Sequence, residues 1–194
     1  MVAPTPRGSL GSWETRTIVT NMFPLLVVLS VIVLWAGITL EEAEEMLAEF
    51  ALLAVMVPVM VDMGGNLGAI LSSRLTTRLH LGTAKFDPRD RVLLANIAAI
   101  VALAATIFVA LALGAWAIGQ VIGAQLGLAT LLTISLISGM GIAVVAVVFS
   151  LLTAYASYRF GIDPDDTTIP VVTNVVDVFG MVIFIGVSAW MLGF

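Results

Sequence analysis

Cysteine is absent from this chain, histidine occurs once, and charged side chains are scarce. Without cysteine the protein can form no disulfide, thiolate metal site or cysteine nucleophile, and the single histidine, His80, has no second soft ligand with which to bind a transition metal. The sequence also lacks a glycine-rich phosphate loop, a nucleophile–base pair and a cofactor motif. These absences argue against an enzyme and against an organic cofactor.

The chain consists largely of apolar residues. Hydrophobic residues make up 60% of its 194 residues and charged residues only 11%, and the mean hydropathy is +1.13. This composition lies outside the usual range of soluble domains and is typical of a polytopic membrane protein. We therefore expect an all-α integral membrane protein that is surrounded by membrane lipids and has no nucleic-acid partner.

The apolar runs predict five transmembrane helices behind a short N-terminal tail at residues 1–16. A run of about 20 residues crosses the roughly 30 Å hydrocarbon core of a bilayer. Thr39 and Glu42 have the spacing of a capping box, and the Asp-Pro-x-Asp pattern at 87–90 and 163–166 is typical of a helix start. The predicted helices cover residues 17–38, 40–73, 88–118, 128–158 and 164–194, within one transmembrane domain over residues 17–194.

The basic residues predict the orientation of these helices. All eight Lys and Arg residues fall before the first helix, between the second and third, or between the fourth and fifth. Five crossings therefore place all of them on one side, which the positive-inside rule identifies as the cytoplasm. The N-terminus is then cytoplasmic and the C-terminus outside, in a multi-pass protein of the cell membrane.

Two predicted helices contain residues that a lipid-facing helix avoids. They lie within residues 57–68 of the second helix and 170–180 of the fifth. Each proline frees a backbone carbonyl one turn upstream, which either serves as a ligand or only accompanies a kink. The helix-breaking residues that we expect to line a pore are Pro58, Gly64, Gly65, Gly68, Pro170 and Gly180.

Asp177 is the sharpest candidate for a cation ligand. At 1.5 Å per residue it lies about 20 to 25 Å from either end of the predicted fifth helix, deep in the membrane. A carboxylate at that depth costs at least about 2.5 to 3.5 kcal/mol, and the sequence places no Lys or Arg there to pair with it. One explanation for a carboxylate at this depth is that Asp177 forms a cation or proton site. The alternative is a protonated Asp177 that is hydrogen-bonded between helices.

Asp62 is the second intramembrane acid. It precedes Gly64 and Gly65, where broken helix geometry would expose backbone carbonyls as further oxygen ligands. The alternative is a solvated carboxylate near the cytoplasmic end of the second helix. Three more polar residues are either metal ligands or helix-packing groups, namely Asn66, Asn174 and Thr173.

Glutamates cluster at the start of the second predicted helix, and two of them, Glu45 and Glu49, are candidates for the outer mouth of a pore. The alternative for this cluster is a solvated helix start. All candidate ligands are oxygen atoms, which favours a hard cation such as Mg²⁺, Ca²⁺ or Na⁺. One or two carboxylates with retained water are usual for Mg²⁺, because that ion dehydrates reluctantly.

These residues resemble a known family. Residues 58–68, with the core Gly-Gly-Asn-Leu-Gly, resemble the second-helix motif of MgtE-type magnesium channels, and Ser-Arg-Leu-Thr-Thr at 73–77 is closer to their solute-carrier relatives. Residues 163–166 and 170–180 are similar to the family's Asp-Pro start, its Pro-x-Val-Thr stretch and its pore aspartate followed by glycine.

The resemblance implies a homodimer with a pore on its two-fold axis, lined by the second and fifth helices. Asp177 of each subunit then holds hydrated Mg²⁺. Asp62 stands where the bacterial members are expected to have a neutral residue, which leaves a Na⁺- or H⁺-coupled divalent cation exchanger, with Asp62 as its coupling residue, as the alternative to a channel. A third interpretation is a membrane assembly subunit that transports nothing.

Overall fold

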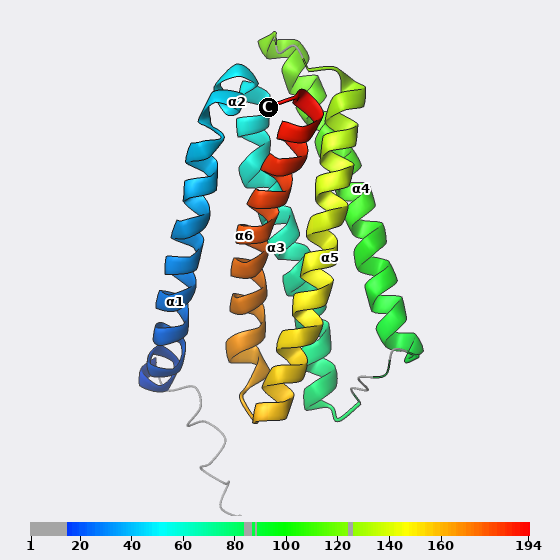
Figure 1. Cartoon of the computed structure of the whole chain (residues 1–194). Helices are drawn as coiled ribbons and strands as arrows, with labels where there is room; N and C mark the ends of the chain where they lie inside the picture. The colour runs from blue at the N-terminus through cyan, green and yellow to red at the C-terminus, as the bar shows by residue number, and fades with distance from the viewer. Residues whose placement is uncertain (1–14, 84–86, 88, 124–125) are drawn as a thin grey trace, which may run out of the picture.

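A computed structural model gives the fold, and it describes residues 15–83, 87, 89–123 and 126–194. These residues form helices and no strand, and five of the helices are long and apolar enough to cross a membrane (Figure 1). The predicted all-α class with five candidate spans is therefore confirmed. The helices are α1 (Thr15–Glu42), α2 (Glu44–Glu49), α3 (Ala51–His80), α4 (Arg91–Ile122), α5 (Leu128–Phe160) and α6 (Pro164–Leu192).

The segment predicted as one helix over residues 40–73 has a different course. The helix α1 continues through Thr39 to Glu42, and the chain then forms the short α2 and, after the non-helical Phe50, the long α3. A capping box contributes only about 1 kcal/mol, so it did not end a helix whose backbone hydrogen bonds continue through it. The helix that carries Asp62 therefore begins at Ala51 and not at residue 40. It ends at His80 and not at residue 73.

The other predicted helix starts fall at or near the observed ones. The helix α6 begins at Pro164, as the Asp-Pro pattern indicates. The helix α4 begins at Arg91, with Asp90 as the N-cap whose side chain accepts a hydrogen bond from the backbone N–H of Val92. The predicted start at Pro88 and most of the predicted N-terminal tail lie outside the described residues.

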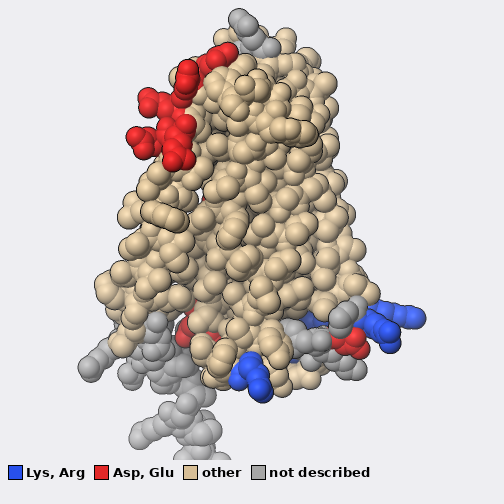
Figure 2. All heavy atoms as spheres, viewed as in Figure 1, with Lys and Arg blue, Asp and Glu red and all other residues tan. Residues whose placement is uncertain are grey.

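The five long helices form one bundle (Figure 1). In it α6 packs against α1, α3 and α5, while α4 packs against α5 and α3. Glutamates gather over the turn between α1 and α2, and the described arginines lie at the opposite end (Figure 2). We call these the acidic end (Glu41, Glu42, Glu44, Glu45) and the basic end (Arg74, Arg78, Arg89, Arg91, Arg159).

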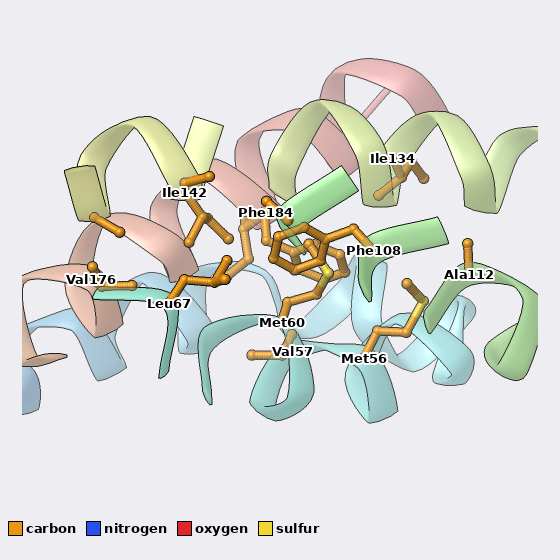
Figure 3. Close-up of a cluster of buried hydrophobic side chains, with 14 of the residues drawn as sticks. Met56, Val57, Met60, Leu67, Phe108, Ala112, Ile134, Ile142, Val176 and Phe184 are labelled. Atoms are coloured by element: carbon orange, nitrogen blue, oxygen red, sulfur yellow. The ribbon is translucent and has the colours of Figure 1, made fainter. Parts of the chain in front are cut away.

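Glycines allow the central helices to approach closely. An added Cβ on Gly64 of α3 would lie 2.2 Å from Cγ2 of Ile142 and 2.9 Å from Cγ1 of Val176. An added Cβ on Gly68 would lie 2.5 Å from Cγ1 of Val172. Because real Cβ contacts are never this short, both glycines are required by the packing of α3 against α5 and α6. Figure 3 shows the fully buried core beside them, where Ile142 and Val176 lie near Leu67.

At the basic end, the polar groups of α3 bind within the chain. Arg78 donates hydrogen bonds to Oδ2 of Asp90 and to the carbonyl of Thr83, and Arg74 donates to Oδ1 of Asn96. The hydrogen bond from the Arg78 guanidinium lowers the pKa of the Asp90 carboxyl below its usual range. These bonds attach the end of α3 to the start of α4.

Candidate cation site

One face of α3 carries polar residues in the middle of an otherwise apolar helix. Gly65 and Asn66 follow Asp62 by three and four residues, so they lie on the same side of the helix as Asp62. We call these three residues the polar face of α3. Asp62 and Asn66 are exposed on the single chain, whereas Gly65 is buried against α6. The neighbouring side of the helix, with Gly64 and Gly68, packs into the core against α5 and α6.

Asp177 of α6 reaches this polar face. An added Cβ on Gly65 would lie 3.8 Å from Oδ1 of Asp177 and 3.9 Å from Cβ of Thr173. Asp62 lies one turn before Gly65 on the same side of α3. The structure thus brings together the two intramembrane acids, which are more than 100 residues apart in the sequence.

Both acids lie deep in their helices. Asp177 is near the middle of α6. The helix α3 continues for about 18 residues, or about 27 Å, beyond Asp62. The alternative in which Asp62 is solvated near the cytoplasmic end of its helix therefore does not fit the structure, because the helix ends at His80 and not near residue 73. Since lipid is a poor environment for a carboxylate, the exposed Asp62 must face water, an ion or another protein surface.

The polar stretches at residues 57–68 and 170–180 do not break the helices that contain them. Both α3 and α6 are continuous through Pro58, through Gly64 and Gly65, and through Pro170. The expectation that broken geometry at the two glycines exposes backbone carbonyls is therefore wrong, because close packing against α5 and α6 keeps α3 helical there. A proline lacks an N–H, so the carbonyls left without their usual helical partner are those one turn before each proline.

The neighbouring polar side chains bind mainly to the backbone or to each other. Nδ2 of Asn66 donates to Oδ2 of Asp62 at 3.1 Å, and Nδ2 of Asn174 donates to the Pro170 carbonyl at 2.8 Å. The Thr173 hydroxyl donates to the carbonyls of Ile169 and Pro170. Since each amide uses only its nitrogen in these bonds, its oxygen is left to accept from water or to contact a cation.

Two grooves are lined by residues of α3 that precede and follow Asp62 in the sequence. The larger, of about 860 Å³, lies between α1, α2, α3 and α6 and includes Pro58, Val61 and Met181. The smaller, of about 540 Å³, lies toward the basic end and is lined by Asn66, Ala69, Ile70, Ser73, Arg74 and Ile169. Val61 precedes Asp62, and Asn66 lies one turn after it. In the order of residues along α3, Asp62 therefore falls between those that line the larger groove and those that line the smaller one.

The glutamates divide between different depressions. Glu41 and Glu44 line the larger groove. Glu45 lines a separate depression beside the end of α6, and Glu49 lines another beside the end of α4. The structure thus places Glu41 and Glu44 at the larger groove, while Glu45 and Glu49, the candidates from the sequence, line other depressions. Which glutamates line the larger groove depends on how α1 and α2 are rotated about their axes, and no pattern in the sequence predicts this rotation.

A single chain offers few ligands for a metal ion. The described residues contain no cluster of three or more His, Asp or Glu side chains that could hold one. Asp62 and Asp177 provide two carboxylates, which suits a cation that keeps much of its water. Further ligands have to come from water, from backbone carbonyls or from a second chain.

The fold defines a multi-pass membrane protein with two acids within its candidate spans. The family model of MgtE, described as a divalent cation transporter, matches residues 57–187, and the chain belongs to this family. The matched segment contains both polar stretches and both acids. MgtE is a family of transporters and not of enzymes. Comparison with curated protein sequences found no significant match.

Proposed function

We propose that the chain forms a homodimer that conducts Mg²⁺ along the polar faces of α3 and α6, with Asp177 of both subunits as the principal ligands. The observation that carries this proposal is the pair of carboxylates within two candidate spans, with Asp62 exposed on the polar face of α3 and Asp177 of α6 reaching that face beside Gly65. Membership of a family of divalent cation transporters supports the same function.

The chemistry of the site supports a hard, hydrated cation. All candidate ligands are oxygens, from Asp62, Asp177, Asn66, Asn174 and Thr173. Two subunits would contribute four carboxylates, enough to attract a divalent ion without removing its inner waters. Mg²⁺ suits such a site best because it dehydrates reluctantly.

A two-fold dimer accounts for the exposed polar residues in mid-membrane. Asp62 and Asn66 are exposed on one chain although they lie in a span. A second copy opposite them would replace lipid with a water-filled passage. With the basic end in the cytoplasm, as the positive-inside rule predicts, the N-terminus is cytoplasmic, the C-terminus is outside, and Glu41 and Glu44 face the exterior of the cell membrane.

The test is Mg²⁺ uptake into proteoliposomes by Asp177→Ala. We expect uptake to be lost while the dimer still assembles, as measured by light scattering during size-exclusion chromatography. Glu49→Ala is the matched control, because Glu49 is an acid that lines a depression away from the path. Undiminished uptake by Asp177→Ala would contradict the assignment of the site.

A second candidate is an exchanger that couples divalent cations to Na⁺ or H⁺ through Asp62. The observation in its favour is that Asp62 lies within a candidate span, on the face of α3 that Asp177 reaches, where a carboxylate with no transport role is unfavourable. Uptake that requires an opposing Na⁺ or H⁺ gradient, and loses that requirement in Asp62→Asn, would favour the exchanger. Uptake by the wild-type protein without either gradient would favour the channel.

The same preparations test the third interpretation, a membrane subunit that transports nothing. Saturable Mg²⁺ binding by the purified protein that is lost in Asp177→Asn would exclude a role restricted to helix packing. No binding by the wild-type protein, together with no uptake, would support that role.

A further inference from the structure

The glycines in the middle of α3 differ in what surrounds them. At Gly64 and Gly68 an added Cβ would overlap side chains of α5 or α6 at 2.2 to 2.9 Å. At Gly65 its nearest neighbours would be Asp177 Oδ1 at 3.8 Å and Thr173 carbons at 3.9 Å, which are ordinary van der Waals distances. The packing of the chain therefore requires glycine at two of these positions and permits alanine at the third.

Glycine at position 65 needs another explanation. Inside a helix, glycine is less favourable than alanine because it loses more backbone entropy on folding. Gly65 lies in the interior of the continuous α3, away from any turn, and none of the described residues lies close enough to require its missing side chain. The space beside it opens onto the Asp177 carboxylate.

We infer that Gly65 is a specificity-determining residue, whose missing side chain leaves room beside Asp177 for a water molecule of the hydrated cation. This inference rests on the proposed function. A water that hydrogen-bonds to Oδ1 lies about 2.8 Å from that oxygen. On the α3 side of the carboxylate, that water and a methyl group 3.8 Å from Oδ1 compete for the same space.

The effect should depend on how firmly an ion holds its water. Mg²⁺ keeps its inner waters and requires near-ideal octahedral geometry, whereas Ca²⁺ accepts six to eight ligands in flexible arrangements. Loss of one water position beside Asp177 should therefore weaken the binding of Mg²⁺ more than the binding of Ca²⁺. In this way Gly65 makes the site prefer the ion that stays hydrated.

The experiment compares Gly65→Ala with the wild-type protein in three measurements: thermal stability in detergent, Mg²⁺ uptake into proteoliposomes, and the concentration of Ca²⁺ that halves this uptake. We expect a melting temperature equal to or above that of the wild type, Mg²⁺ uptake lower by about tenfold, and inhibition at a lower Ca²⁺ concentration. Gly114→Ala is the matched control, because Gly114 is a helical glycine in α4 with no atom within 4 Å of an added Cβ.

Two results would overturn the inference. One is a clear fall in melting temperature for Gly65→Ala, since the fold would then require this glycine. The other is wild-type Mg²⁺ uptake and wild-type sensitivity to Ca²⁺ in Gly65→Ala while Asp177→Ala is inactive, which would leave the proposed function intact. Full activity of Asp177→Ala would instead overturn the proposed function itself.

Discussion

The two sides of α3 use the same kinds of residue for different purposes. On the packed side, Gly64 and Gly68 remove side chains so that α5 and α6 can approach. On the polar face, the neighbours of Gly65 lie at ordinary van der Waals distances from an added Cβ, so helix packing does not require a glycine there. Asp62 and Asn66 of the same face are exposed in the middle of the span. The packing of one chain therefore explains Gly64 and Gly68. The polar face of α3, with Asp62, Gly65 and Asn66, serves something outside the chain.

A similar contrast exists along the length of α3. At its basic end, Arg74 and Arg78 bind Asn96 and Asp90 within the chain. In mid-membrane, Asp62 receives one hydrogen bond, from Asn66 one turn away on the same helix. The polar groups at the end of α3 therefore hold the bundle together, whereas the exposed acid in its middle is left to bind an ion, water or a second chain.

The largest effect on stability is expected for Gly64→Ala. Its methyl group would overlap Ile142 and Val176, so these side chains and the helices that carry them must shift. Overpacking of this kind costs about 1 to 3 kcal/mol, and occasionally more. The melting temperature in detergent should fall clearly below that of the wild type and of Gly114→Ala. An unchanged melting temperature would mean that the packed side of α3 does not need its glycines.

A much smaller effect is expected at the basic end for Asp90→Asn. Asparagine keeps the N-cap but removes the ion pair with Arg78, so thermal stability at neutral pH should fall slightly. The folded pKa of Asp90 is lowered, so the ion pair stabilises the protein above the ordinary carboxyl pKa of about 4 and this contribution is lost as the pH falls through the lower, folded value.

The melting temperatures of the two proteins should accordingly differ by the same small amount at about pH 6 and pH 8 and converge below about pH 4. Mg²⁺ uptake by Asp90→Asn should equal that of the wild type. A large loss of uptake would show that the basic end, and not only the polar face, takes part in transport.

Local features of the sequence were sufficient to predict some of these elements. The five spans follow from the length of their apolar runs, and the depth of Asp177 follows from counting residues along the fifth of them. The Asp-Pro pattern marks the start of α6 because it acts within one turn of the backbone. None of these predictions depends on contacts between helices.

Features that depend on tertiary contacts could not be predicted in this way. The helix α3 stays intact through Gly64 and Gly65 because neighbouring helices support it, which a local pattern does not reveal. The helix α3 continues to His80, beyond the predicted end at residue 73, so Asp62 lies about 18 residues from the end of its helix. Only the packing distances distinguish Gly65 from Gly64, since the two residues are identical and adjacent in the sequence.

The most direct test of the central claim uses the absence of cysteine from the chain, since single-cysteine variants then need no prior substitutions. Ala54→Cys and Ala69→Cys place a thiol in the larger and the smaller groove, and Ala110→Cys places one on the exposed, apolar surface of α4 as the matched control. The measurement is the rate at which a charged, water-soluble thiol reagent modifies each variant in proteoliposomes, with and without Mg²⁺. If the polar face borders a water-filled cation path, both groove cysteines react, Mg²⁺ slows their reaction, and Ala110→Cys stays unmodified. Groove cysteines that react no faster than Ala110→Cys would contradict the account.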